Sequence, residues 1–221
     1  MKHIFFDCDG VLVDSEIIAN RVWVARLERM GLSMTEKHFI QTYAGKREEE
    51  VRAQISSEYG LTFEAEFLEN ILKELDDRIH AELEAVKGMK ELVSAISVKM
   101  SVVSNSSQYQ ANRSLNITGM WELFEGRCYT SDMVTHPKPA PDVYLHALHQ
   151  TQQAKESSIV VEDSSTGVKA AKSAGLRVIG FLGASHIMEG HYDKLEAAGA
   201  DRIAKDAEEL KTILMELGFY N

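Results

Sequence analysis

Two aspartates stand two positions apart near the start of the sequence. Asp7 and Asp9 follow a short apolar run at residues 3–6, and Gly10 comes directly after them. In an extended backbone, residues i and i+2 point to the same side, so the two carboxylates would lie together. Neighbouring carboxylates repel, and the pKa of one rises strongly unless a cation sits between them. The pair therefore predicts a metal site or a division of labour between a nucleophile and an acid. A simple acidic turn is the alternative.

Polar and acidic side chains also follow two later apolar runs. Ser104 ends one such run, and Glu162 and Asp163 follow another at residues 158–161. In a parallel α/β sheet, ligands bind at the carboxyl ends of the strands. We therefore expect these groups to converge with the first pair of aspartates. Asp163 would add a hard oxygen ligand of the kind that Mg²⁺ prefers.

The elements that would position these groups alternate between strand and helix. Short apolar runs are typical of buried parallel strands, and segments with helical spacing of apolar residues separate them. Strands are expected at residues 3–6, 100–104, 158–161, 177–181 and 202–204, and helices around 89–96, 141–148, 168–174 and 210–217. The alternation predicts an α/β fold with a Rossmann-like parallel sheet and helices on both faces.

One long segment interrupts the alternation. Between residues 16 and 83 no convincing strand pattern occurs, but apolar residues form two stripes with helical spacing, at residues 18–30 and 67–83. Such stripes are typical of helices that bury one face. We therefore expect a core domain made of residues 1–15 and 84–221, with residues 16–83 inserted as a helical domain after the first strand.

Composition and charge exclude several classes of function. The chain has 221 residues, of which 44% are hydrophobic, and a formal net charge of -10. That charge argues against nucleic-acid binding, because the sequence-independent part of such affinity comes from Lys and Arg on phosphates. No stretch approaches the ~20 apolar residues of a membrane span, and the apolar start is too short for a signal peptide. With only two cysteines, a cytoplasmic protein is expected; its oligomeric state is not indicated.

Four segments together resemble the motifs of haloacid dehalogenase superfamily phosphatases. The first is Asp-Cys-Asp-Gly-Val-Leu-Val-Asp-Ser-Glu at residues 7–16, and the second is Ser-Asn at 104–105. The third is Lys-Pro-Ala-Pro-Asp at 138–142, and the fourth is Glu-Asp-Ser-Ser-Thr-Gly at 162–167. All four occur in order, and the inserted helical segment is similar to the small cap of the phosphoglycolate phosphatase and beta-phosphoglucomutase group.

The resemblance implies a covalent mechanism of phosphate transfer. Asp7 would attack phosphorus and become an aspartyl-phosphate, which splits one difficult step into two. Asp9 would protonate the leaving alcohol and then take a proton from the hydrolytic water. Ser104 and the backbone N–H of Asn105 would hold the phosphoryl oxygens, and Lys138 would neutralise charge on Asp7 and the phosphate.

The same resemblance implies a magnesium ion as cofactor. Asp7, the backbone carbonyl of Asp9 and Asp163 would bind Mg²⁺, with Glu162 outside the direct ligands or acting through water. The substrate would be a small phosphorylated metabolite, for which local positive charge suffices. Specificity would come from the inserted domain, where Gly45, Lys46 and Arg47 form a small basic cluster. A solvated surface cluster is the alternative for these three.

Other residues are expected to have structural roles. Cys8 lies between the two aspartates and should point the opposite way, into the packed interior. His136 stands two positions before the third motif and is expected to be an exposed loop residue. His186 and His191 have no pattern of metal ligands around them in the sequence and are expected on the surface.

Several functions fit this set of motifs, and a phosphatase acting on a sugar, sugar-acid or polyol phosphate fits best. Sugar-phosphate mutases are similar but generally carry a histidine shortly after the first motif, where residues 17–20 here contain none. Dehalogenases and phosphonate hydrolases depart from the pattern at the position of Asp9. A non-enzymatic binding protein on the same fold is the alternative from another class, since fold alone does not settle function.

Overall fold

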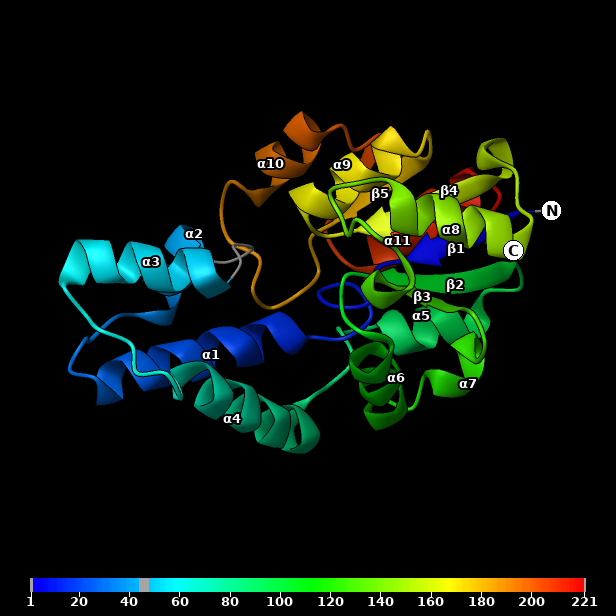
Figure 1. The fold of residues 1–221 in the computed structure, drawn as a ribbon. Coiled ribbons are helices and arrows are strands. Elements are labelled where there is room, and N and C mark those ends of the chain that lie inside the picture. Colours follow the sequence, from blue (N-terminus) through cyan, green and yellow to red (C-terminus); the bar gives the residue numbers. More distant parts are fainter. Residues whose placement is uncertain (1, 44–47, 221) are drawn as a thin grey trace. The chain divides into compact units, whose positions relative to one another are not determined.

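The computed structural model describes residues 2–43 and 48–220 and divides into two compact units (Figure 1). The first unit contains Met1–Asp14 and Glu84–Asn221, and the second contains Ser15–Leu83. Each unit is described by itself. The basic cluster of residues 45–47 lies outside the described residues.

The first unit is built on one sheet of six parallel strands. The strands are β1 (His3–Phe6), β2 (Lys99–Ser104), β3 (Cys128–Thr130), β4 (Ser158–Glu162), β5 (Arg177–Phe181) and β6 (Arg202–Ala204). Their order is β3-β2-β1-β4-β5-β6, so β1 pairs with β2 on one side and with β4 on the other. Strands β2 and β3 are added on one side of β1, and strands β4, β5 and β6 are added on the other side. Parallel sheets bind ligands at the carboxyl ends of the strands where the order of addition switches in this way.

Helices cover both faces of the sheet, as expected for parallel strands that are mostly apolar and buried on both sides. On one face, Phe5, Val103 and Val160 pack into a cluster of buried residues from the helices that follow β3. These helices are α8 (Asp142–Thr151), α9 (Ser165–Ser173) and α10 (His191–Ala198). The predicted α/β fold with a parallel sheet is confirmed.

The opposite face carries the helices of the other half of the unit (Figure 1). They are α5 (Met89–Ala95), α6 (Gln108–Ile117), α7 (Trp121–Phe124) and α11 (Ala207–Glu216). Phe6, which alternates with Phe5 along β1, makes an edge contact with Phe124 at a ring distance of 6.3 Å. Two short 3-10 helices, at Ser131–Met133 and Lys155–Ser157, complete the unit.

Polar residues cap the helices that begin near the carboxyl edge of the sheet. Ser107 precedes α6 and forms a capping box with Gln110, in which each side chain bonds the backbone N–H of the other, so two free backbone donors are satisfied. Ser164 precedes α9 and accepts a hydrogen bond from the N–H of Gly167 at 3.0 Å. Gly175, two residues after α9 ends, has a φ of 81°, which terminates the helix as expected for glycine.

The described residues of the second unit form four helices. They are α1 (Ser15–Arg29), α2 (Glu36–Tyr43), α3 (Glu48–Tyr59) and α4 (Phe67–Glu82). Leu27, Phe39 and Ile55 lie in one buried cluster, and Val22 lies in a second one with residues of α4. The described residues of this unit form no strand.

The structure differs from the sequence-based expectations in several short elements and at one residue of α4. The strand β3 was not predicted, because three residues are too few to show a pattern, and α6, α7 and α10 were not predicted either. Leu72 was placed in the apolar stripe of α4 but is 48% exposed. Within the described ranges, each helix is too short or too polar to cross a membrane.

Candidate functional site

Three carboxylates meet at the carboxyl edge of the sheet. Asp7 follows β1, while Glu162 ends the neighbouring strand β4 and Asp163 follows it. One oxygen of each carboxylate lies within 4.8 Å of the other two, and all three residues are buried. Asp7 is held on β4 by a hydrogen bond from its backbone N–H to the carbonyl of Val161 at 3.0 Å.

Lys138, from the third motif, brings an ammonium group to this cluster, and it is itself buried. Its Nζ lies 2.6 Å from Asp7 Oδ1, 2.6 Å from Glu162 Oε1 and 2.7 Å from the carbonyl oxygen of Val103. An ammonium group has three N–H donors, and here each one has an oxygen acceptor. The Lys138 side chain is therefore fixed against Asp7.

Asn105 fixes the backbone of Lys138. The Asn105 side-chain oxygen accepts a hydrogen bond from the Lys138 N–H at 2.8 Å, and its amide group donates to the Lys138 carbonyl at 3.1 Å. The loop after β2 thus holds the loop that precedes α8. The side chain of Asn105 positions Lys138, a function that the sequence did not indicate.

The charges in this cluster do not balance. Burial raises the pKa of Asp7 well above its ordinary value; the Glu162 carboxylate adds to this shift, and Lys138 opposes it. Burial and Glu162 likewise raise the pKa of Asp163. Burial would lower the pKa of Lys138, but the carboxylates of Asp7 and Glu162 raise it above its ordinary value.

A divalent cation fits this cluster. Three carboxylates share one ammonium group, so the excess negative charge is what a bound cation would compensate. Carboxylate oxygens are the ligands that Mg²⁺ prefers. Asp7 and Asp163 both belong to the cluster, and Glu162 lies with them while it also contacts Lys138.

The Asp9 carboxylate has a different environment. Asp9 is half-buried, and its Oδ2 accepts a hydrogen bond from Ser106 Oγ at 2.7 Å and a longer one from Ser104 Oγ at 3.4 Å. The Asp9 side chain therefore lies beside Ser104 at the end of β2 and beside the following loop, which carries Ser106. Cys8, between the two aspartates, is fully buried, as predicted.

Two residues near the site were missed in the sequence. Ser106 contacts Asp9, and the only signal was its place in the Ser-Asn-Ser-Ser run after β2. Tyr144 donates a hydrogen bond from its hydroxyl to Glu162 Oε1 at 2.8 Å, and its ring centre lies 5.0 Å from Lys138 Nζ. Helical spacing marked Tyr144 only as a core residue, which cannot reveal where a hydroxyl points.

Two glycines leave room for the carboxylates. A Cβ on Gly10 would overlap the Asp163 carboxylate, and the φ of Gly10 is 81°, a conformation that L side chains rarely adopt. A Cβ on Gly167 would overlap the carboxylate of Glu162. The glycines of the first and fourth motifs therefore allow the backbone to approach the acidic groups closely.

The expectation that His186 and His191 lie on the surface was wrong. His186 is only 8% exposed, and its Nε2 lies 3.3 Å from Asp163 Oδ2. His191 is half-buried at the start of α10, with its Nε2 2.6 Å from the carbonyl oxygen of Asp163. A loop that follows β5 returns to the sheet edge, which no local pattern reveals. His136 is exposed, as expected, and pairs with Asp142 at 3.0 Å.

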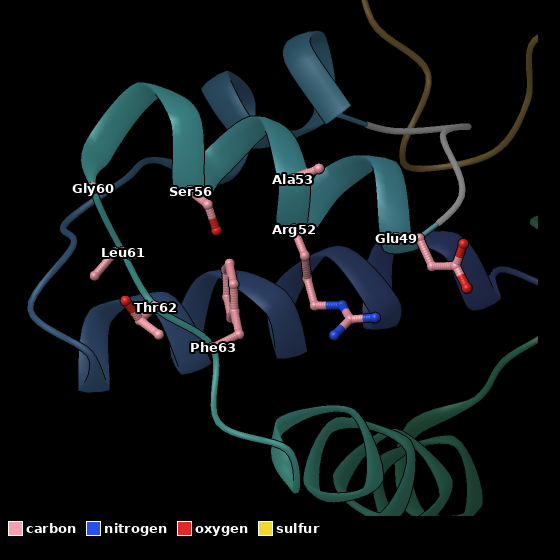
Figure 2. A pocket seen from close by; sticks show the side chains of 8 residues that line it. All are labelled: Glu49, Arg52, Ala53, Ser56, Gly60, Leu61, Thr62 and Phe63. Carbon is pink, nitrogen blue, oxygen red and sulfur yellow. The ribbon is translucent and has the colours of Figure 1, made fainter.

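The second unit contains an open pocket of about 590 Å³ between α3 and the segment after it (Figure 2). Its lining includes Arg52 and Ser56 of α3 together with Gly60 and Phe63. Figure 2 shows the side chains of Arg52, from α3, and Phe63, from the segment after it, both extending into the space between that helix and that segment. Glu49 is the one acidic residue of the lining, so the pocket has no group of carboxylates like that at the sheet edge.

The chain is similar to known proteins. Residues 4–181 match the model of a family described as haloacid dehalogenase-like hydrolase. The chain is 30% identical over 187 residues to 6-phosphogluconate phosphatase of Escherichia coli, covering 84% of this chain and 85% of that protein. It is 28% identical to a phosphorylated carbohydrates phosphatase of Thermotoga maritima, over 98% of this chain and 100% of that one.

A solved structure agrees with these relatives. A haloacid dehalogenase family hydrolase from Deinococcus radiodurans, with bound phosphate and sodium, superposes with a TM-score of 0.88 at 28% identity, covering 100% of this chain and 98% of that one. The family match spans most of the chain and includes Asp7, Lys138 and Asp163. By sequence, fold and the grouping of its carboxylates, the chain belongs to the haloacid dehalogenase-like hydrolases.

Proposed function

We propose that the protein hydrolyses the phosphate monoester of a small sugar, sugar acid or polyol through an aspartyl-phosphate on Asp7. The observation that carries the proposal is the pair of unlike aspartates at the end of β1. Asp7 is buried against Lys138 Nζ at 2.6 Å, whereas Asp9 is half-buried and bonded to Ser106. Two carboxylates in different environments suit a nucleophile and an acid–base.

In the first step, an Asp7 carboxylate oxygen attacks phosphorus. A bond forms between this oxygen and phosphorus, and the bond from phosphorus to the ester oxygen breaks. The electron pair goes to the leaving oxygen, which takes a proton from Asp9 and departs as an alcohol. Lys138 neutralises charge on Asp7 and the phosphoryl group, and the Ser104 hydroxyl and Asn105 backbone N–H bind the phosphoryl oxygens.

In the second step, water attacks the phosphorus of the aspartyl-phosphate. Asp9, now a carboxylate, takes a proton from that water. The bond between phosphorus and the Asp7 oxygen breaks, its electron pair returns to the Asp7 carboxylate, and inorganic phosphate leaves. Both steps use the same two side chains, so the enzyme returns to its starting state.

Asp7 and Asp163, with the backbone carbonyl of Asp9, would hold Mg²⁺, and the Glu162 oxygen in the same group lies beside them or acts through water. When bound, the ion supplies positive charge against the phosphoryl oxygens. Fixed positive charge matters because uncatalysed hydrolysis can require acceleration approaching ~10²¹-fold. General acid–base catalysis supplies only ~10²–10⁴ of that, so positioning and electrostatics must supply the rest.

The names of the two relatives support phosphorylated carbohydrates as the substrate class. A sugar-phosphate mutase is less well supported because both of these relatives are named phosphatases. A purely binding protein is also less well supported, because binding alone has no use for an acid–base beside a nucleophile. The products distinguish the three: phosphate and an alcohol, an isomeric sugar phosphate, or no product.

The proposal is tested by measuring phosphate release from a panel of sugar, sugar-acid and polyol phosphates, with and without Mg²⁺. We expect turnover by the unmodified protein, none by Asp7→Asn, and a loss of ~10²-fold or more in Asp9→Asn. Asp77→Asn, which changes an exposed aspartate in α4, is the matched control and should leave turnover unchanged. Turnover by Asp7→Asn at the unmodified rate would contradict the proposal.

A further inference from the structure

Two histidines contact a single acidic residue of the site. His186 Nε2 lies 3.3 Å from Asp163 Oδ2, and His191 Nε2 lies 2.6 Å from the Asp163 carbonyl oxygen. The two imidazole rings are nearly perpendicular, with centres 6.3 Å apart. One histidine thus contacts the side chain of Asp163, and the other contacts its backbone.

The acceptors determine which ring nitrogens carry hydrogen. A carbonyl oxygen only accepts hydrogen bonds, so the Nε2 of His191 must be the donor. A carboxylate has no hydrogen to donate, so a hydrogen bond across the 3.3 Å between His186 Nε2 and Asp163 Oδ2 requires the hydrogen on Nε2. The two contacts restrict both the side-chain torsion of Asp163 and the orientation of the peptide group that follows it.

The loop that carries His186 is itself anchored to the first motif. The backbone N–H of Ser185 donates to Asp14 Oδ1 at 3.1 Å, and the Ser185 hydroxyl also bonds the Asp14 carboxylate. A further bond within the loop joins the Ile187 N–H to the Ala184 carbonyl at 3.2 Å. His186 is therefore presented to Asp163 by a loop tied to the turn after Asp9, and its ring lies beside Gly10.

We propose that His186 and His191 are positioning residues that hold Asp163 in the orientation needed to bind a divalent cation, and so set the affinity of the site for that ion. The inference rests on the proposed function, in which Asp163 is a metal ligand. Partners that hydrogen-bond a metal ligand orient it, and their loss typically costs 10–100-fold in metal affinity. Neither histidine touches the reacting phosphoryl group in this account.

The test measures binding of Mn²⁺ and Mg²⁺ to the metal-free protein by isothermal titration calorimetry, without substrate. His186→Phe and His191→Phe keep a ring but remove the N–H donor, and we expect each to raise the Kd by about tenfold or more. His186→Gln and His191→Gln keep a donor and should stay within about threefold of the unmodified protein. His149→Phe, an exposed histidine in α8, should not change the Kd.

The outcomes separate this inference from the proposed function. Asp163→Asn should weaken metal binding more than either histidine variant. If Asp163→Asn weakens binding but the phenylalanine variants, shown to be folded by circular dichroism, bind with unchanged Kd, the inference is wrong and the metal site stands. If the unmodified protein binds neither ion, both are wrong. Should a phenylalanine ring prevent folding, His186→Ala and His191→Ala give the same comparison with the same expected weakening.

Discussion

At the scale of single residues, the Lys138 ammonium group contacts other groups besides Asp7. Its Nζ also contacts Glu162, and Glu162 in turn accepts hydrogen bonds from the hydroxyls of Tyr144 and Ser164. Glu162 is fully buried, so each of these donors compensates for water that the carboxylate has lost. This hydrogen-bond network fixes the Lys138 ammonium group beside Asp7, the proposed nucleophile.

Tyr144→Phe tests this network by removing one oxygen atom. A buried hydrogen bond to a charged acceptor contributes about 1.5–3 kcal/mol, so we expect the free energy of unfolding to fall by about that amount, together with a lower kcat. Urea unfolding and steady-state kinetics measure the two effects. Tyr109→Phe removes a hydroxyl from a residue that is 71% exposed and should change neither. Equal stability of the two variants would show that the Tyr144 hydroxyl does not support Glu162.

At the scale of secondary structure, the sequence predicted the elements that have long or strongly apolar patterns. The strands β1, β2, β4, β5 and β6 lie where their apolar runs predict, and the grouping of Asp7 with Asp163 follows from their parallel arrangement. The edge strand β3 has three residues and no visible period. The helix α6 could have been predicted from Ser107 and Gln110, which form a capping box.

Contacts made by loops could not be predicted in the same way. Ser185 bonds Asp14 across 171 positions of the chain, and this contact brings His186 to the site. Periodicity reports only on neighbours within one element, so it gives no information about where a loop returns. The polar partners of the acidic residues, such as Ser106 and His186, were therefore missed.

The strand β1 also carries a titratable group at its other end. His3 is buried, and its Nε2 lies 2.9 Å from Ser101 Oγ of β2. Burial lowers the pKa of His3 to about 4, and the positive charges of Lys99 and Arg127 add to the shift. The unfolded chain, with an ordinary pKa near 6.5, binds a proton at His3 in the range where the folded protein does not.

Stability should therefore fall as the pH falls from about 6.5 to about 4. A shift of this size corresponds to roughly 3 kcal/mol, which is fully present above pH 6.5 and lost as the pH falls to about 4. His3→Gln should remove this component, so its free energy of unfolding should change less than that of the unmodified protein between pH 7 and pH 4.5. His149→Gln, at an exposed site, should keep it. Parallel pH profiles for the unmodified protein and His3→Gln would refute this assignment.

At the scale of the whole molecule, all the described groups of the site belong to one of the two units. Asp7, Asp9, Lys138 and Asp163 lie in the unit formed by Met1–Asp14 and Glu84–Asn221, while Ser15–Leu83 forms the helical unit. The helical unit begins at Ser15, within the last two residues of the first motif. We propose that it acts as a cap that selects the leaving group.

Ligands of the site should stabilise the protein as a whole. A ligand that binds only the folded state stabilises it by about 2.7 kcal/mol at one hundred times its Kd. For a chain of this length, that corresponds to a rise in Tm of about 5–10 °C. We expect a rise of this size with Mg²⁺ and inorganic phosphate together, measured by differential scanning calorimetry. In Asp163→Asn the rise should be much smaller; an equal rise there would place the ligands elsewhere.

The claim that Asp7 forms the covalent intermediate is tested most directly by trapping it. Asp9→Asn lacks the base for the second step, but an aryl phosphate has a leaving group that departs without an acid, so the aspartyl-phosphate should accumulate. Borohydride reduces an acyl phosphate to an alcohol, which converts the aspartate to homoserine. After rapid mixing with aryl phosphate and borohydride, peptide mass spectrometry should find homoserine at position 7 and nowhere else. Two results would contradict the account. One is an unmodified Asp7 after one equivalent of aryl alcohol per enzyme molecule has been released, and the other is homoserine in place of another aspartate.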